Sequence, residues 1–410
     1  MKFSKLFKKT AKSGDSEKPA PAREAGLASE GGTPPEQAGR AASGTPRFPG
    51  GPGRPRTADR GISQQNTDKS EGEIRSRPRR PPQEKQSGED REKQQSEANA
   101  VYGESISVVR ELLNSVNDSG LHGYSRFSVI SEKIQSLLEK GNEQILAATF
   151  HATGGNYLYA HSVNTAILAL QMGRSLKLSS DEQRFLGCCG FFHDMGMTGF
   201  MQLASKESRL SEDEYVDIKR HSDMGARLSD NIQDMDVETA GRLKLVISQV
   251  HERFDGSGYP HGLRGASMDP LAQMLAAADV FEALTHPRSW RKALTPHKAV
   301  KFLMNRKGTE FPVQTVKMFL ETFSMYPPGS YVKLTTGEIA RVVGVNPGML
   351  TRPELEIVLD ASGRPVSRQY LNLPDHPLSH ITDAIDLTGE HIPDRAILMQ
   401  MESSRWWVDW

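Results

Sequence analysis

The chain has 410 residues, no net formal charge and only two cysteines. A domain usually takes about 100–200 residues, so two or three structural units are expected. Cys188 and Cys189 are adjacent, which excludes a disulfide framework and a cysteine-based zinc site and indicates a reducing, cytoplasmic setting. No stretch approaches the roughly 18 consecutive apolar residues of a membrane span, so no transmembrane segment is predicted.

Charge and composition divide the chain near residue 100. Residues 1–100 hold 20 Lys/Arg against 14 Asp/Glu, and the rest of the chain holds 31 against 37. A domain that binds a nucleic-acid polymer normally has a basic folded surface, so the acidic body argues against that class. Eleven of the 24 prolines lie in the first 100 residues, and Phe48 is the only aromatic residue between 11 and 100. Such a segment cannot bury enough apolar surface to offset chain entropy, so we predict that residues 1–100 are disordered.

Two short segments of this arm leave alternatives open. Met1–Thr10 mixes lysines with apolar residues, as would a weak helix that binds a membrane surface or a partner. A solvated basic start is the simpler interpretation. Residues 75–82, Arg-Ser-Arg-Pro-Arg-Arg-Pro-Pro, fit an SH3-like or anionic partner, and more simply a solubilising linker.

Helical periodicity begins at Glu104, where apolar residues recur at spacings of three and four. Ser180 with Gln183 resembles a capping box for a helix that ends at residue 192. Ser211 with Glu214 resembles another, which is predicted to open a helix through residue 221. The remaining predicted helices are 129–138, one that begins near 161, 243–250, 271–284, 296–304 and 313–323.

After residue 323 the pattern changes from helix to strand. Short alternating runs at 331–334, 339–343 and 355–359 are separated by turn residues. We therefore predict a mainly α fold with a helical domain at 101–323, a small β appendage at 324–390 and a loosely ordered tail at 391–410.

The chemistry is concentrated in five elements that follow one another along the helical domain. A lone histidine on a helix is more often packed or solvated than a ligand, but here several such groups lie among apolar residues. His193 and Asp194 end the apolar run 185–192, and Asp279 lies inside the run 275–281. Buried carboxylates and imidazoles are costly unless they are paired. The five elements are His161, His193-Asp194, His221, the loop His251–Pro260, and Asp279.

A shared cation would satisfy these groups. His193, Asp194 and Asp279 can pair through one metal ion, and His161 completes a mixed nitrogen and oxygen shell. Such a shell suits Fe, Mn, Zn or Ni better than Ca.

This ordered set resembles the HD superfamily of phosphohydrolases. The loop from His251 to Pro260, with Gly258-Tyr259-Pro260 intact, is similar to the signature of the HD-GYP branch, and His221 also matches that branch. The similarity covers residues 104–323 and includes the β appendage in outline. It implies an HD-type helical bundle and the metal-dependent hydrolysis of cyclic di-GMP in bacterial second-messenger signalling.

The resemblance also implies residue roles. It predicts one or two divalent transition metal ions, Fe or Mn in preference, with His193 and Asp194 as the catalytic residues. Asp194 would bridge two ions, and a hydroxide between them would attack phosphorus. The implied metal ligands are His161, His193 and Asp279 on one side, His221 and His251 on the other, and Asp194 between them.

The implied substrate contacts come from the loop and from two arginines. Gly258, Tyr259 and Pro260 would contact the dinucleotide, and a guanidinium from Arg288 or Arg291 suits both phosphate and guanine. The simpler alternatives are a structural turn and two surface charges. The expected partners are cyclic di-GMP and diguanylate cyclase-type or other signalling proteins, and no nucleic-acid polymer.

The chain departs from the family pattern at three positions. Met197 stands where the family usually has a lysine, Val250 where it has a histidine, and Tyr157 where trimetal members have a glutamate. A thioether carries no positive charge, and a valine cannot bind metal. Two hypotheses follow: a slower phosphodiesterase, or a degenerate module that senses cyclic di-GMP or serves as a protein adaptor. Retention of the core ligands favours catalysis.

Overall fold

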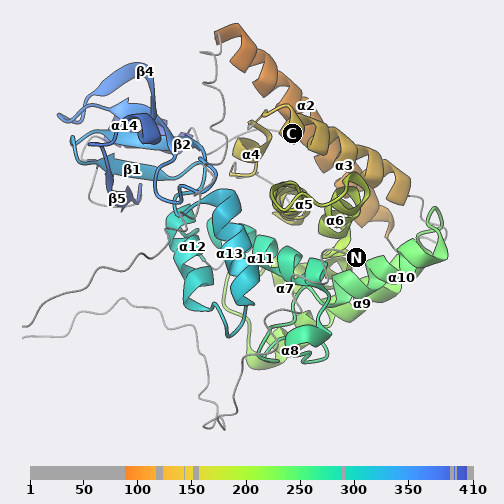
Figure 1. The fold of residues 1–410 in the computed structure, drawn as a ribbon. Helices are drawn as coiled ribbons and strands as arrows, with labels where there is room; N and C mark the ends of the chain where they lie inside the picture. Colours follow the sequence, from red (N-terminus) through yellow and green to blue (C-terminus); the bar gives the residue numbers. More distant parts are fainter. Residues whose placement is uncertain are drawn as a thin grey trace, which may run out of the picture. The chain divides into compact units, whose positions relative to one another are not determined.

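The computed structural model describes residues 88–116, 123–142, 144–150, 157–288, 291–387, 392 and 395–403 (Figure 1). The predictions for Met1–Thr10, for residues 75–82 and for the rest of the arm up to residue 87 lie outside this part of the chain. Within it, no helix combines the length and apolar character needed to cross a membrane.

The described chain is mainly helical up to residue 323, as predicted. The longest helices are α2 (Gly88–Ser115), α5 (Tyr157–Ser175), α3 (Tyr124–Glu139) and α11 (Pro270–Thr285). The others are α4 (Gln144–Ala148), α6 (Ser180–Phe192), η1 (Met195–Phe200), α7 (Met201–Ala204), α8 (Glu212–Lys219), α9 (His221–Leu228), η2 (Ser229–Asn231), α10 (Val237–Ser248), η3 (Gly265–Ser267), α12 (Pro296–Asn305) and α13 (Val313–Phe323).

Helices α5 and α6 lie side by side at the centre of the helical part (Figure 1). Both are buried over most of their length because apolar and small residues occupy nearly every face. The two backbones approach closely where Gly190 on α6 meets Ala166 on α5: a Cβ added at Gly190 would lie 2.5 Å from the Cα of Ala166. This close packing fixes the relative positions of His161 on α5 and His193 at the end of α6.

Several helix boundaries differ from the sequence predictions, and three of the differences bear on the helical domain most directly. α2 begins at Gly88, before the predicted start at Glu104, so the prediction of disorder is wrong for residues 88–100, which are helical. The capping box of α6 is formed by Ser179 and Glu182, one residue before the predicted pair, because the carboxylate of Glu182 can bond the backbone N–H of Ser179. The capping box at Ser211 is correct, but its helix ends at Lys219 and α9 begins at residue 221.

The C-terminal part is a five-stranded antiparallel sheet with the order β4-β3-β2-β1-β5. Its strands are β1 (Tyr331–Leu334), β2 (Ile339–Gly344), β3 (Glu354–Leu359), β4 (Pro365–Asn372) and β5 (Ile381–Ile385). Side chains alternate between two apolar clusters, so that Tyr331 faces one and Val332 the other. The three predicted strands are present, and β4 and β5 were missed.

The predicted loose tail is partly helical. Helix α14 (Arg395–Ser403) packs on one face of the sheet, where Met401 joins the cluster of Tyr331 and Ile385. The hydroxyl of Tyr331 donates to the backbone carbonyl of Met401 at 3.3 Å. The tail therefore adds apolar cover to the sheet.

The contact between α5 and α6 is open to a direct test. We expect Gly190→Ala to destabilise the protein by about 1–3 kcal/mol, because the added methyl group overlaps backbone that cannot move freely. Chemical denaturation of the two proteins measures the difference. Gly241→Ala is the matched control: nothing lies within 4 Å of its added Cβ, so this helical alanine should stabilise by about 0.5–1 kcal/mol. Equal stabilities for the two variants would contradict the packing argument.

Candidate metal centre

Four imidazoles and two carboxylates from five separate chain segments meet in the helical part. The Nε2 atom of His161 lies 3.3 Å from Asp194 Oδ2 and 3.2 Å from Asp279 Oδ1. It also lies 3.3 Å from Nε2 of His193. On the other side of Asp194, Nε2 of His221 and of His251 lie 3.3 and 3.5 Å from Oδ1. All six residues that the sequence predicted as metal ligands are thus brought together.

Asp194 belongs to both halves of the cluster. One set of groups that could hold an ion is His161, His193 and Asp194, and the other is Asp194, His221 and His251. Asp279 lies beside both, with Oδ1 3.8 Å from His193 Nε2 and Oδ2 3.6 Å from His251 Nδ1. Buried Asp194 Oδ1 has no hydrogen-bond partner, and an unsatisfied carboxylate oxygen facing imidazole nitrogens suits a bound cation. The side chains therefore fit a divalent metal with mixed nitrogen and oxygen ligands.

The histidines are held so that one ring nitrogen faces the centre. His193 donates its Nδ1–H to the carbonyl of Gly190 at 2.8 Å, and His221 donates its Nδ1–H to the carbonyl of Ile218 at 2.6 Å. A histidine whose Nδ1 carries the proton offers the lone pair of Nε2. Local backbone therefore orients both rings as ligands.

His161 is oriented by a buried carboxylate that the sequence analysis missed. Nδ1 of His161 contacts a carboxylate oxygen of Glu282, and the other oxygen accepts from Asn164 at 3.0 Å. Tyr102 extends the network by donating to Asn164 at 2.9 Å, and His286 Nδ1 lies 3.0 Å from Glu282. Glu282 lies three residues after Asp279 on α11, so both carboxylates share a helix face. That spacing was the available signal.

The charges of the cluster are strongly coupled. Burial opposes ionisation of Asp194, yet the electrostatic influence of His193 and the close approach of the imidazoles of His161, His221 and His251 hold its pKa well below the ordinary value. Burial likewise opposes the imidazolium of His161, but the attraction of Glu282 and hydrogen bonds to Asp194 and Asp279 raise its pKa well above the ordinary value. For His251, burial prevails and lowers the pKa. The carboxylates are thus ionised, as metal ligands must be.

The loop after His251 is anchored by Glu252, whose side chain is buried. Its carboxylate accepts from the backbone N–H groups of His261 at 2.7 Å and Leu263 at 2.9 Å. A Cβ at Gly258 would lie 2.3 Å from the backbone nitrogen of Arg253. Gly256 has φ +81°, which favours glycine. These glycines permit the loop to fold on itself, which fits the structural turn that the sequence left open as the alternative to substrate contact.

Tyr259 brings this loop against the metal centre. Its ring stacks on His251, with 5.0 Å between centroids and 13° between planes, and meets His221 edge to face at 6.0 Å. Burial and the negative charge of Asp194 raise the pKa of Tyr259 well above its ordinary value, so its hydroxyl stays protonated. Pro260 follows through a cis peptide bond and is partly buried.

The two arginines singled out from sequence lie in different environments. The guanidinium of Arg288 stacks over Tyr157 at 3.9 Å from the ring centroid, and its Nη2 lies 3.8 Å from Glu282. Arg291 instead donates to backbone carbonyls at the C-terminal end of α11, including that of Leu284 at 3.3 Å. Arg288 therefore borders the centre, while Arg291 caps a helix.

The three departures occupy different places. Met197 and Val250 are 5 % and 0 % exposed and belong to the main apolar core. Tyr157 lies beneath the guanidinium of Arg288 and offers no carboxylate. The first two positions thus serve packing in this chain.

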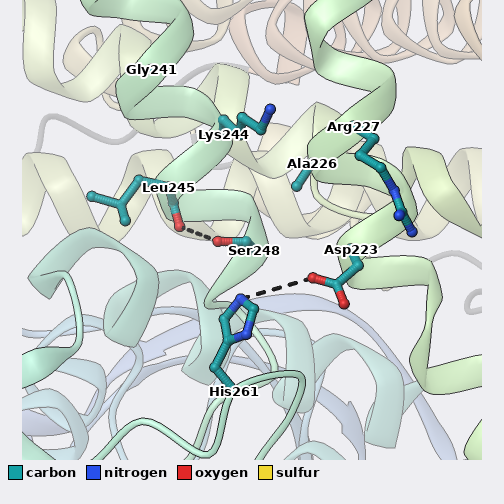
Figure 2. Close-up of a pocket in the computed structure, with 8 residues that line it drawn as sticks. All are labelled: Asp223, Ala226, Arg227, Gly241, Lys244, Leu245, Ser248 and His261. Carbon is teal, nitrogen blue, oxygen red and sulfur yellow. Dashed lines mark hydrogen bonds and ion pairs between the residues drawn. The ribbon is translucent and has the colours of Figure 1, made fainter.

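A cavity of about 530 Å³ lies elsewhere, between α9 and α10. Figure 2 shows Asp223 and Arg227 of α9 facing Lys244 and Ser248 of α10, with His261 at one end. His261 Nε2 lies 3.8 Å from Asp223. None of the residues that line this cavity belongs to the metal cluster.

Two regions of the chain match known protein families. Residues 133–312 match the model of the HD domain, and residues 331–390 match the KOW domain associated with the HD domain. The HD match contains the whole cluster, and the KOW match contains all five strands.

Curated relatives point to the same family. A cyclic di-GMP phosphodiesterase of Pseudomonas aeruginosa is 28% identical over 60% of this chain and 58% of its own length. The cyclic di-GMP phosphodiesterase response regulator RpfG of Xanthomonas campestris is 30% identical over 56% and 55%. A 3'3'-cGAMP-specific phosphodiesterase of Vibrio cholerae is 33% identical over 36% and 33%. The chain thus spans a little over half the length of the first two relatives.

Among solved structures, Bd1817, an HDG"Y"P protein from Bdellovibrio bacteriovorus, is similar with a TM-score of 0.47 and 21% identity, over 58% of this chain and 73% of that one. The helical bundle, the ordered His/Asp cluster and the family match together define an HD-type protein. The match of residues 133–312 to the HD domain model and the cyclic di-GMP phosphodiesterases among the relatives support the HD-GYP branch of the HD domain family.

The buried carboxylate behind His161 supports a second testable expectation. Glu282→Gln keeps the size of the side chain but removes its charge, so we expect metal affinity to fall about 10- to 100-fold. Titration of the metal-free protein with Mn²⁺, followed by calorimetry, measures the change. Glu321→Gln is the control, because Glu321 lies near the end of α13 and its one ion pair within the described residues is with Lys317 at 3.9 Å. Unchanged affinity for Glu282→Gln would contradict the orienting role.

Proposed function

We propose that this chain hydrolyses a phosphodiester bond of cyclic di-GMP with the help of divalent transition metal ions, Fe or Mn. The observation that carries the proposal is the buried oxygen Oδ1 of Asp194, which has no hydrogen-bond partner and lies close to imidazole nitrogens on both sides. A cation would satisfy that oxygen and the facing imidazoles together. The cyclic di-GMP phosphodiesterases among the relatives support the choice of substrate.

In this proposal the ligands form two sides that share Asp194. His161, His193 and Asp279 hold one ion, and His221 and His251 hold the other. Bound metal supplies Lewis acidity toward the phosphate and activates water near neutral pH. The chain keeps both carboxylates ionised and fixes the imidazole rings through Glu282 and through the carbonyls of Gly190 and Ile218. His193 and Asp194 are the proposed catalytic residues because both contact the reacting centre.

We assign substrate contacts to the rim of the centre. Arg288 is the leading candidate for the dinucleotide, since its guanidinium lies flat on Tyr157 next to His161 and could turn toward phosphate. Tyr259 offers a protonated hydroxyl and a ring, and Gly258 and Pro260 set its position. Arg291 would need to leave the carbonyls that it now caps.

The alternative is a catalytically degenerate module that senses cyclic di-GMP or acts as a protein adaptor. The burial of Met197 and Val250 in the apolar core favours it, because neither position can supply a cation or a fourth ligand. A centre that keeps all six core ligands favours catalysis. The 3'3'-cGAMP-specific relative adds a second cyclic dinucleotide that belongs in the same assay.

We also propose the division of the chain into four parts: an arm at 1–100, the HD-GYP domain at 101–323, the β appendage at 324–390 and a tail at 391–410. The matched region 133–312 lies within the proposed HD-GYP domain, and the matched region 331–390 lies within the proposed β appendage, which supports these two parts. Diguanylate cyclase-type or other signalling proteins are the proposed partners.

Activity decides between the two functions. We expect the purified full chain with Mn²⁺ or Fe²⁺ to convert cyclic di-GMP to linear product, as followed by chromatography. His193→Ala and Asp194→Ala should abolish turnover and lower bound metal measured by mass spectrometry, because each removes a ligand. His376→Ala, an exposed histidine of the C-terminal part, is the control and should leave both unchanged. Tight binding without product over hours would favour the sensor.

The departures predict a gain of function. Met197→Lys should raise the turnover rate, because one transition-state donor contributes about a hundred- to a thousandfold in other enzymes. Val250→His places an imidazole in the core, so its thermal midpoint should rise more on addition of Mn²⁺ than that of the parent chain. Differential scanning calorimetry with and without metal measures this. Equal rates and equal metal-induced shifts would contradict our account of both positions.

A further inference from the structure

Helix α8 is a surface helix that adds little to the core. None of its residues is fully buried, and Tyr215 and Val216 are 51% and 55% exposed. It is nevertheless firmly placed: Ser211 and Glu214 form its capping box, and Lys206 bonds both oxygens of Glu214 at 2.7 Å. A well-anchored helix whose side chains stay outside the core is suited to present those side chains to something else.

Two residues of α8 face the metal centre through Tyr259. The ammonium of Lys219 lies 4.4 Å from the ring centroid of Tyr215 and 5.6 Å from that of Tyr259. The ring of Tyr259 in turn stacks on His251 at 5.0 Å. Only one aromatic ring therefore separates the ammonium from a residue of the metal cluster. Cation–π contacts of this kind hold a charge in place without neutralising it.

Lys219 has no carboxylate partner in the described part of the chain, and its ammonium faces aromatic rings instead. Arg288 lies 3.8 Å from Glu282, Arg220 lies 3.2 Å from Asp217, and Arg253 lies 3.9 Å from Glu310. A cation that is held by aromatic rings and left unpaired retains its full attraction for an incoming anion.

We infer that Lys219 is a substrate-binding residue that takes a phosphate group of the cyclic dinucleotide at the rim of the metal centre. The inference rests on the proposed function, since it requires an anionic substrate at the cluster. Tyr215 is the positioning residue: its ring holds the ammonium over Tyr259, from where the flexible lysine side chain can extend to phosphate. A cyclic dinucleotide has two phosphates, so one can be held here while the other lies at the metal centre.

The test compares charge and ring variants in the metal-loaded full chain. Lys219→Met should weaken binding of a slowly hydrolysed phosphorothioate analogue of cyclic di-GMP about tenfold by calorimetry, and raise KM similarly with kcat nearly unchanged. Lys219→Arg should restore most of the affinity. The loss should shrink at high salt, because a partly exposed ion pair is screened. Metal content should equal that of the parent chain.

The aromatic support has its own matched pair. Tyr215→Phe keeps the ring and should bind the analogue as the parent does, whereas Tyr215→Ala should weaken binding by a smaller factor than Lys219→Met. Lys298→Met is the charge control, because Lys298 pairs with Asp386 on the C-terminal part.

These experiments distinguish an error about Lys219 from an error about the proposed function. If the parent chain binds the analogue and Lys219→Met binds it equally well at low salt, the role of Lys219 is wrong and the proposed function stands. If the metal-loaded parent chain neither binds nor hydrolyses cyclic dinucleotides, both are wrong.

Discussion

The structure depends on the burial of three carboxylates, Asp194, Asp279 and Glu282, inside a tightly packed set of helices. A buried anion is costly unless cations or donors surround it. Here the compensation comes from imidazoles that reach the same point from several helices. Because α5 and α6 approach closely at Gly190, the packing that closes the core also sets the distance between His161 and His193. The packing of α5 against α6 therefore determines both the helical core and the geometry of the site.

The two halves of the centre are not equivalent. One side has two carboxylates, Asp194 and Asp279, and a third, Glu282, behind His161. The other side shares Asp194, has Asp279 Oδ2 at 3.6 Å from His251 Nδ1, has no carboxylate equivalent to Glu282 among the contacts of its two imidazoles in the described chain, and has Nε2 atoms 2.9 Å apart. Coulomb attraction for a divalent ion grows with the number of nearby anions. In the proposed enzyme the first side would therefore hold an ion more tightly than the second, and Val250 would add no ligand to the second side.

Helices and strands could be predicted accurately from the sequence where their apolar pattern ends at clear turn residues. The predicted helix 313–323 and strand 331–334 match α13 and β1, because their apolar periodicity ends abruptly at turn residues. The capping box was shifted by one residue because two overlapping serine pairs satisfy the same spacing, and the charged Glu182 favours the earlier one. Strand β4 begins at a proline and carries polar residues, so its pattern is weak.

Residue type and burial pattern predicted His161, His193, Asp194 and Asp279 as ligands, the family resemblance added His221 and His251, and the structure places all six together. The sequence did not reveal the residues that support the ligands and the loop from behind. Glu282 looked like an ordinary helical residue until its distance to His161 was known, and Gly258 is explained by a contact with Arg253 that no local pattern predicts. The contact between Glu282 and His161 joins residues 121 positions apart, so it depends on three-dimensional packing.

The same packing bears on how a chain without a lysine at position 197 could still attract an anion. Gly196 lies so close to α9 that an added Cβ would be 2.0 Å from the carbonyl oxygen of His221. The turn that carries Met197 therefore adjoins the corner between α8 and α9, two residues after Lys219. A cation supplied by α8 enters from the flank of the centre, through Tyr259, and Arg288 stands near His161 on the other side of the cluster. Cations on two flanks of the centre suit a ligand with two phosphates, whereas a single lysine at the turn would favour a ligand with one phosphate.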